Sequence, residues 1–273
     1  MAFKDIVIPV FLVPEDEAAL RAAELVGDLA DAHLTAVYVG VEPDPVIAEG
    51  YVDGQIWQDI AERLAEDARA ANEALQKRPW SRRIAMREVR TRPSFLGDDL
   101  AAIARCADLV VMTRPQGKWS DSARAEVFEA ILFGAGRPVL LVPSDWREPI
   151  GRTVMIAWSG KRESARAVAD AMPLIEAADK VVIATVGERE ERSYASAESL
   201  AANLVRHSIH AERRLVSAAS GEEADALLAA ARSASADLIV MGGYGHARAA
   251  EFVFGGVTRA LSRSSPLPLL LAH

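Results

Sequence analysis

The residues with the clearest chemical potential are glycines near the end of the chain, between Asp237 and Thr258. An apolar run, Leu238–Met241, stops there at a first glycine cluster, which consists of Gly242, Gly243 and Gly245. Glycine reaches positive φ and has no Cβ, so a glycine turn after a strand lets backbone amides approach a ligand closely. The helix expected after the turn adds unpaired N–H donors and a positive dipole end. The stretch therefore predicts an anion site.

A second glycine pair follows one apolar stretch later. Gly255 and Gly256 precede Val257 and Thr258, so a second set of amides and a hydroxyl could reach the same anion. The spacing Gly-x2-Gly-x9-Gly through both groups predicts a phosphate-binding loop after the fourth strand of an α/β unit. Either group could instead make a tight turn or break a helix without any ligand.

Other side chains with chemical potential are weaker candidates. Tyr244 and His246 flank the glycine loop and could pack over a ligand or face solvent. Lys161 follows a glycine but lacks the upstream spacing and the following Ser or Thr of a Walker motif, so we expect a solvated charge. His207 and His210 have a helical metal spacing, yet no further His or Cys completes a ligand set, so no metal is predicted.

The glycine spacing resembles the signature of universal stress proteins, Gly-x2-Gly-x9-Gly followed by Ser or Thr. In nucleotide-binding members of that family the signature wraps the ribose and phosphates of ATP. The final segment, SPLPLLLAH, is similar to the closing strand of the family. The sequence departs from the family at Gly256, where Ser or Thr is usual, so one hydroxyl donor is missing and Thr258 lies two residues further on.

The resemblance also implies contacts after two other strands. Family members commonly hold the ribose or base with an Asp after the first strand, and alignment by strand places Ser159 there in the second half and Phe11 in the first. A neutral hydroxyl is a weaker partner than a carboxylate, and Phe offers none. Adenine is held by main-chain groups after the second strand, which here implies Thr185 and Val186. The implied cofactor is ATP or a related adenine nucleotide.

Alternating strands and helices must position these residues. In the first half, apolar runs predict buried strands at Asp5–Val13, Leu34–Val41, Ile84–Arg90, Leu109–Met112 and Val139–Val142. Helical spacing of Ala and Leu predicts helices at Glu15–His33, Trp57–Gln76, Gly97–Cys106 and Ser122–Phe133. The segment Glu42–Gln55 has two prolines and two glycines, which predict a loop.

The second half repeats the alternation. Its predicted strands are Thr153–Trp158, Val181–Val186, Ala211–Val216, Leu238–Met241 and Leu267–Leu271. Its predicted helices are Glu163–Ile175, Tyr194–His207, Glu222–Ser233 and one after the glycine loop. The run Asp237–Met241 parallels Asp108–Met112, which indicates an internal duplication. We expect an α/β protein with two tandem, doubly wound, mainly parallel five-stranded sheets, each with ligands outside the carboxyl ends of its strands.

The two expected domains are residues 1–147 and 148–273, joined by the polar link Ser144–Gly151. The first lacks the first glycine pair, and Pro115 has no N–H to donate, so we expect that half not to bind nucleotide in the same way. Both closing strands are expected at sheet edges. The resemblance implies that they pair inside one chain as family members pair in dimers, and a further homodimer is left open.

Composition limits the class of protein. The chain has 273 residues, 51% hydrophobic and 26% charged, which is ordinary for a globular protein of two domains. Residues 1–147 carry −7 and residues 148–273 carry −1 of the formal net charge of −8, which argues against a nucleic-acid partner. No stretch reaches membrane-span length and no signal peptide is evident. The single cysteine, Cys106, is expected in the core and favours a cytoplasmic location.

The leading hypothesis is a cytoplasmic stress-response protein whose second half binds ATP or a related adenine nucleotide. ATP hydrolysis would need a base and a metal ligand near the phosphates, and the loop supplies only amides and Thr258. The protein is therefore not expected to be an enzyme, although a very weak ATPase is an alternative. A nucleotide-free scaffold or partner-binding protein is another, in which Gly256 and Ser159 record the loss of the site.

Overall fold

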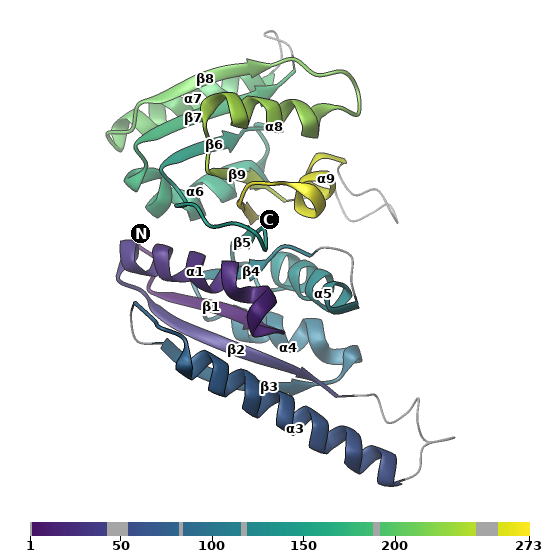
Figure 1. The fold of residues 1–273 in the computed structure, drawn as a ribbon. Helices are drawn as coiled ribbons and strands as arrows, with labels where there is room; N and C mark the ends of the chain where they lie inside the picture. Colours follow the sequence, from purple (N-terminus) through teal and green to yellow (C-terminus); the bar gives the residue numbers. More distant parts are fainter. Residues whose placement is uncertain (1, 43–53, 82–83, 116–118, 188–191, 244–255) are drawn as a thin grey trace.

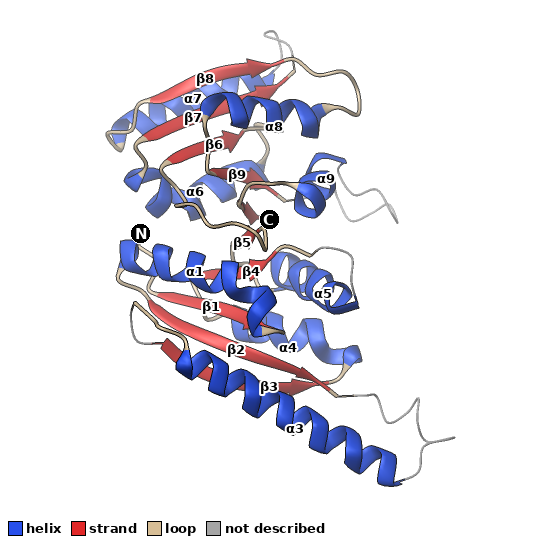
Figure 2. Ribbon diagram, in the orientation of Figure 1, coloured by secondary structure: helices blue, strands red, loops and turns tan. Residues whose placement is uncertain are grey.

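The computed structural model describes residues 2–42, 54–81, 84–115, 119–187, 192–243 and 256–273. Within these residues ten strands form one sheet in the order β3-β2-β1-β4-β5-β10-β9-β6-β7-β8. Helices flank both faces of the sheet (Figure 2). In Figure 1 the first half of the chain, coloured from purple to teal, lies below the second half, which continues from teal through green to yellow. None of the helices within these ranges is long and apolar enough to cross a membrane.

The first half contains five strands and the helices that connect them. The strands are β1 (Asp5–Val10), β2 (His33–Val41), β3 (Ile84–Thr91), β4 (Leu109–Thr113) and β5 (Val139–Val142). The helices are α1 (Val13–Ala30), α3 (Gly54–Lys77), α4 (Leu96–Ala104) after the short 3-10 helix η1 (Pro93–Phe95), and α5 (Trp119–Gly134). The first strand ends three residues earlier than predicted, because Pro14 in the first turn of α1 starts the helix there.

The second half repeats this order. Its strands are β6 (Thr153–Ala157), β7 (Lys180–Val186), β8 (Ala211–Val216), β9 (Leu238–Gly242) and β10 (Leu269–Ala272). Its helices are α6 (Arg162–Ala177), α7 (Arg192–Arg206), α8 (Glu223–Ala234) and α9 (Gly256–Ser264). Predicted and observed elements agree within a few residues at their ends. The prediction of an α/β fold with a mainly parallel, doubly wound arrangement is confirmed.

The two expected sheets are joined into one. Strands β5 and β10 pair antiparallel, with Leu269 opposite Leu141 and Leu271 opposite Val139, and the other strand pairs are parallel. The closing strands therefore pair inside the chain, as the resemblance implied. The prediction that they lie at sheet edges was wrong for the sheet as a whole, whose edges are β3 and β8, because each closing strand covers the other's unpaired backbone groups.

The helices divide between the two faces of the sheet. One apolar core contains Leu20 of α1, Leu75 of α3, Leu174 of α6 and Leu204 of α7. The other core contains buried residues of the remaining helices, which are Leu100 of α4, Ile131 of α5, Leu227 of α8 and Leu261 of α9. The molecule is therefore a three-layer sandwich in which each half contributes two helices to each face.

The duplication is visible in two equivalent carboxylates just before β4 and β9. Asp108 Oδ2 accepts hydrogen bonds from the Lys4 and Asp5 amides at 2.7 and 3.0 Å. Asp237 accepts from the Gly151 and Arg152 amides at 2.8 and 3.1 Å. Each carboxylate thus binds the backbone at the start of the neighbouring first strand, which explains the repeated Asp.

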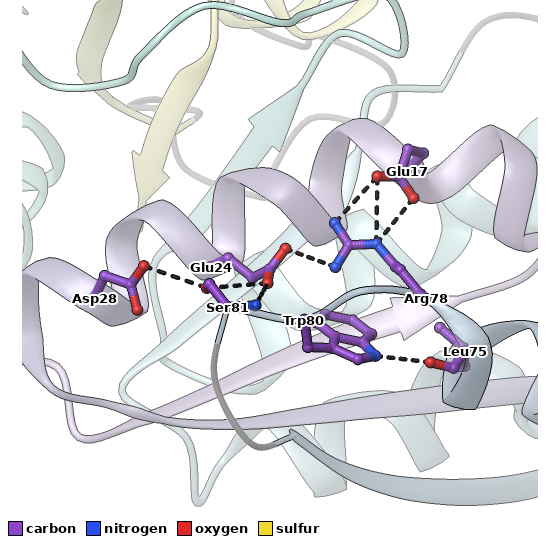
Figure 3. Close-up of polar contacts among 7 residues, drawn as sticks. All are labelled: Glu17, Glu24, Asp28, Leu75, Arg78, Trp80 and Ser81. Atoms are coloured by element: carbon purple, nitrogen blue, oxygen red, sulfur yellow. Dashed lines mark hydrogen bonds and ion pairs between the residues drawn. The ribbon is translucent and has the colours of Figure 1, made fainter.

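A polar cluster fixes the end of α3 on α1 (Figure 3). Arg78 donates to Glu17 at 3.0 Å and to Glu24 at 2.6 Å, and its guanidinium lies 4.1 Å from the centre of the Trp80 ring. The amide of Ser81 donates to Glu24 at 2.7 Å. Because these groups bind one another, the cluster holds the α3–β3 connection in place and is structural.

Cys106 is exposed, so its predicted place in the core was wrong. The helix α4 ends at Ala104, two residues before the cysteine, and the apolar face of the helix does not continue to it. His207 likewise lies beyond the end of α7, where its Nδ1 is 3.7 Å from Glu176 Oε1.

Candidate functional site

A cleft of about 570 Å³ lies at the carboxyl edge of the strands in the second half. Its walls come from the ends of β6, β7 and β9, from the connection between β8 and α8, and from the start of α9. Ligands of doubly wound sheets bind outside the carboxyl ends of the strands, where the strand order reverses. Here that point is between β6 and β9, which pair although they are distant in sequence.

Three helices begin at this cleft. Lys161 is the N-cap of α6, Glu223 is the first residue of α8, and Gly256 is the first residue of α9, and all three line the cleft. The first turn of a helix has unpaired N–H groups and a partial positive charge. Three such ends around one cavity favour an anionic ligand.

Six of the residues predicted from sequence meet in this cleft. They are Ser159, Val186, Gly242, Gly256, Val257 and Thr258. They come from three strand ends and one helix start that are distant in sequence, so the fold brings together what the resemblance implied. Three further predicted residues, Gly245, His246 and Gly255, lie outside the described residues, as does Tyr244.

Gly242 is required by packing. A Cβ on this residue would lie 2.6 Å from the Glu163 carbonyl carbon and 2.6 Å from the Ser164 nitrogen, in the first turn of α6. Such distances are far below van der Waals contact and involve backbone that cannot easily move. Gly242 therefore lets α6 approach the end of β9, and with it brings the start of α6 to the cleft.

Gly243 does not serve a ligand through its amide, which corrects the prediction. Its N–H donates to the carbonyl of Ala272 at 2.7 Å, as the continuation of the β9–β10 ladder. A Cβ here would lie 2.9 Å from Leu132 Cδ2 in the first half of the chain. The residue is buried and does not line the cleft. Gly243 is thus a packing residue at the junction of the halves.

The side chain of Thr185 lies on the face of β7 away from the cleft, whereas the contact predicted for Thr185 and Val186 is through their main-chain groups. Successive side chains of a strand point to opposite faces. Val182 and Ala184 pack in the core beneath α8, while Ile183 packs in the other core. Thr185 follows Ile183 in this alternation, and it is 1% exposed. Of the two residues predicted here, only Val186 lines the cleft.

Two hydroxyl residues of the cleft, Thr258 and Ser159, already have protein partners. Thr258 Oγ1 donates to the Gly242 carbonyl at 3.4 Å, which fixes the start of α9 against the end of β9. Ser159 Oγ donates to Ser164 Oγ at 3.2 Å, and Ser164 donates to the Lys161 carbonyl at 2.8 Å. No atom of the described residues lies within 4 Å of a Cβ added at Gly256, the position where the family carries a hydroxyl.

Several residues that line the cleft were not predicted from the sequence. Trp158 lines it and is held by a hydrogen bond from its Nε1 to Ser196 Oγ at 2.8 Å. Lys161, expected to be a solvated charge, is exposed and also lines the cleft. Ser220 comes from the β8–α8 connection, and Glu223 is the first residue of α8. That connection has no glycine signature, and its only signal is polar residues directly after the third predicted strand.

Glu163 of α6 is a buried acid beside the cleft. Burial alone would raise the pKa of Glu163, but Arg162 donates to its Oε1 at 2.6 Å. That hydrogen bond, a backbone hydrogen bond and the positive charge of Arg162 together hold the pKa of Glu163 below its ordinary value. The carboxylate is therefore ionised at neutral pH and adds a fixed negative charge behind the first turn of α6.

The equivalent place in the first half is filled by protein groups. Asp16 Oδ2 accepts hydrogen bonds from the amides of Phe11 and Leu12 at 2.8 and 3.1 Å. Arg124 of α5 donates to the same oxygen at 3.2 Å and lies 5.3 Å from the centre of the Phe11 ring. The amides after β1 are thus bound by the carboxylate of the chain itself.

Within the described residues, no group of three or more His, Cys, Asp or Glu side chains could hold a metal ion.

The fold and the cleft define a doubly wound α/β protein with a cleft at the carboxyl edge of the strands in its second half. Residues 151–273 match the universal stress protein family, which confirms the resemblance seen in the glycine spacing. The second half of the chain thus belongs to that family, and the first half has the same fold. None of the curated proteins compared with the sequence matches it.

Two solved structures share the fold over nearly the whole chain. A universal stress protein from Archaeoglobus fulgidus has a TM-score of 0.69 at 15% identity, covering 98% of this chain and 97% of that chain. A putative universal stress protein from Pseudomonas aeruginosa has a TM-score of 0.58 at 14% identity, covering 99% and 93%. Both chains therefore contain the same two-part arrangement, and at these identities the likeness concerns the fold.

Proposed function

We propose that the second half of the protein binds ATP or a related adenine nucleotide and that the protein acts as a cytoplasmic stress-response binding protein. The observation that carries the proposal is the cleft at the carboxyl edge of the second half, where α6, α8 and α9 all begin. A cavity of about 570 Å³ is large enough for a nucleotide, since ligand pockets span about 300–1,000 Å³.

The residues of the cleft divide into a polar and an apolar part. Gly256 and Val257 supply main-chain amides at the start of α9, which suit phosphates, and Lys161 adds a positive charge. Ser159 follows β6 and offers a hydroxyl for the ribose. Val186 and Leu227 form an apolar wall for the base. This division matches a ligand with a charged tail and an aromatic ring.

We propose a binding role rather than catalysis, with very weak ATP hydrolysis as a further activity to be measured. The two-domain division, residues 1–147 and 148–273, belongs to the same proposal, with the first domain degenerate. The second candidate is a nucleotide-free scaffold or partner-binding protein. It is favoured by the hydroxyl of Thr258, which is donated to the Gly242 carbonyl, and by the missing hydroxyl at Gly256.

Titration calorimetry of the purified chain with ATP, ADP and AMP, together with thermal unfolding, tests the proposal. A ligand present at 100 times its dissociation constant should stabilise the protein by about 2.7 kcal/mol. The variant Val186→Trp should lose binding, because the indole fills the apolar part of the cleft. Val205→Trp is the matched control, since Val205 is 49% exposed on α7 and does not line the cleft.

Binding of ATP by wild type and Val205→Trp, with loss in Val186→Trp, supports the proposal. If wild type shows neither heat nor a melting shift with any of the three nucleotides at millimolar concentration, the proposal is wrong and the nucleotide-free scaffold is favoured. Equal binding by Val186→Trp and Val205→Trp would place the nucleotide outside this cleft. Phosphate release measured in the same samples decides whether hydrolysis accompanies binding.

A further inference from the structure

The order of the strands gives the cleft two ends. In the second half the order is β9-β6-β7-β8. The start of α9 and Gly242 lie at the β9 end, where the amides suit phosphates. Ser220 and Glu223 follow β8 and lie at the opposite end. A nucleotide with its phosphates at α9 therefore extends its base across β6 and β7 toward Glu223.

Glu223 is a half-buried carboxylate whose side chain has no hydrogen-bond or ion-pair partner among the described residues. Glu223 is the first residue of α8, and a carboxylate only accepts hydrogen bonds. Partly buried charges are more stable when donors are supplied. A ligand in the cleft would supply donors that the described protein groups do not provide.

The same face of α8 offers an apolar surface. Leu227 is four residues after Glu223, so the two side chains are neighbours on the helix, and both line the cleft. Glu222 and Asp225 are also acidic and near the helix start, but they are exposed and do not line the cleft. Of these three acidic residues at the start of α8, only Glu223 lines the cleft, where it is next to Leu227.

Resting on the proposed function, we propose that Glu223 accepts a hydrogen bond from the amino group of the nucleotide base and makes the cleft selective for amino-bearing purines such as adenine. Leu227 supports the ring face and Glu223 recognises the ring edge. Apolar contact alone discriminates weakly between similar rings, whereas a hydrogen-bonding group discriminates strongly. Glu223 is thus a specificity-determining residue.

A comparison of two ligands with three proteins tests this inference. ATP and purine riboside triphosphate differ only in the amino group at position 6 of the ring, and calorimetry gives the affinity of each. Wild type should bind ATP about tenfold more tightly, since a hydrogen bond to a charged group has that effect. Glu223→Ala should bind the two ligands equally. Glu222→Ala is the matched control and should keep the wild-type ratio.

The conservative variant Glu223→Gln keeps an acceptor oxygen and should retain part of the preference for ATP, which guards against a folding defect in the alanine variant. If wild type and Glu223→Ala show the same ratio of affinities, the inference is overturned while the proposed function stands. If wild type binds neither ligand, the proposed function fails and the inference fails with it.

Discussion

The segments that follow the first strand of each half, β1 and β6, have the same layout but different contents. In the first half protein groups fill the space there, and in the second half a cleft remains. Asp16 lies five positions after Phe11 in the first half, and Ser164 lies five positions after Ser159 in the second. Asp16 binds the backbone amides after β1, whereas Ser164 binds the Ser159 hydroxyl and leaves a cleft beside it. A few side chains at the carboxyl edge of the strands thus decide whether a half of this fold has room for a ligand.

The first half closes its edge with an ion pair. Arg124 is 1% exposed and binds Asp16, also 1% exposed, and Glu15. The helix that carries Arg124, α5, has 16 residues, whereas α9 has 9. The guanidinium thus comes from the early part of a longer helix and stands over the Phe11 ring. The carboxylate of Asp16 and the guanidinium of Arg124 thus occupy this edge of the first half.

The largest expected effect comes from breaking this ion pair. Arg124→Met leaves the carboxylate of Asp16 buried without its cation, and the removal of one partner of such a pair costs about 3–5 kcal/mol. Urea denaturation measures the free energy of unfolding. The double variant Arg124→Met/Asp16→Asn should recover much of the loss, because no buried charge remains. A loss below about 1 kcal/mol in the single variant would show that the pair does not stabilise the first half.

A smaller loss is expected from the glycine that sets the distance between α6 and β9. Gly242→Ala places a Cβ against the backbone of Glu163 and Ser164, and such overpacking costs about 1–3 kcal/mol. Gly256→Ala is the matched control, since none of the described residues has an atom within 4 Å of its added Cβ. Thermal unfolding of the two variants should differ clearly. Equal melting temperatures would contradict a packing role for Gly242.

A substitution at the start of α9 should increase the affinity of the second half for ATP. Gly256→Ser restores the hydroxyl that the universal stress protein signature carries, at a place with room for it. One added neutral hydrogen bond should raise the affinity for ATP about fivefold. Calorimetry with Gly256→Ala beside it separates the hydroxyl from the change at the helix start. An unchanged affinity would mean that the phosphates do not reach the start of α9.

The smallest expected effect is a pH dependence that belongs to the second half. The pKa of Glu163 is lowered in the folded protein, so its contribution to stability is full above the ordinary pKa of a glutamate. It is lost as the pH falls through the lowered pKa. Glu163→Gln should therefore be less stable than wild type at neutral pH and should approach it in acid. Urea midpoints between neutral pH and pH 3 measure this, and parallel curves would argue against the shift.

Much of the fold follows from local patterns. The buried strands read directly as apolar runs, and the repeated Asp before Leu109 and Leu238 marks equivalent clamps in both halves. Local patterns did not distinguish the roles of neighbouring residues of the same type. Gly242 and Gly243 look alike in the sequence, but one touches α6 and the other continues the sheet. That difference depends on which element lies opposite each Cα.

The amino-acid sequence alone predicted the alternation of strands and helices, the duplication, and the glycines at the end of β9 and the start of α9. Those features depend on residue type and spacing along the chain, which local backbone and burial preferences govern. Only the tertiary structure decided that β5 and β10 join the halves, that Thr185 points away from the cleft, and that Glu223 lines it. These features depend on the register of the strands and on which helices begin at the carboxyl edge of the sheet. Contacts between segments distant in sequence determine the register and the helix positions.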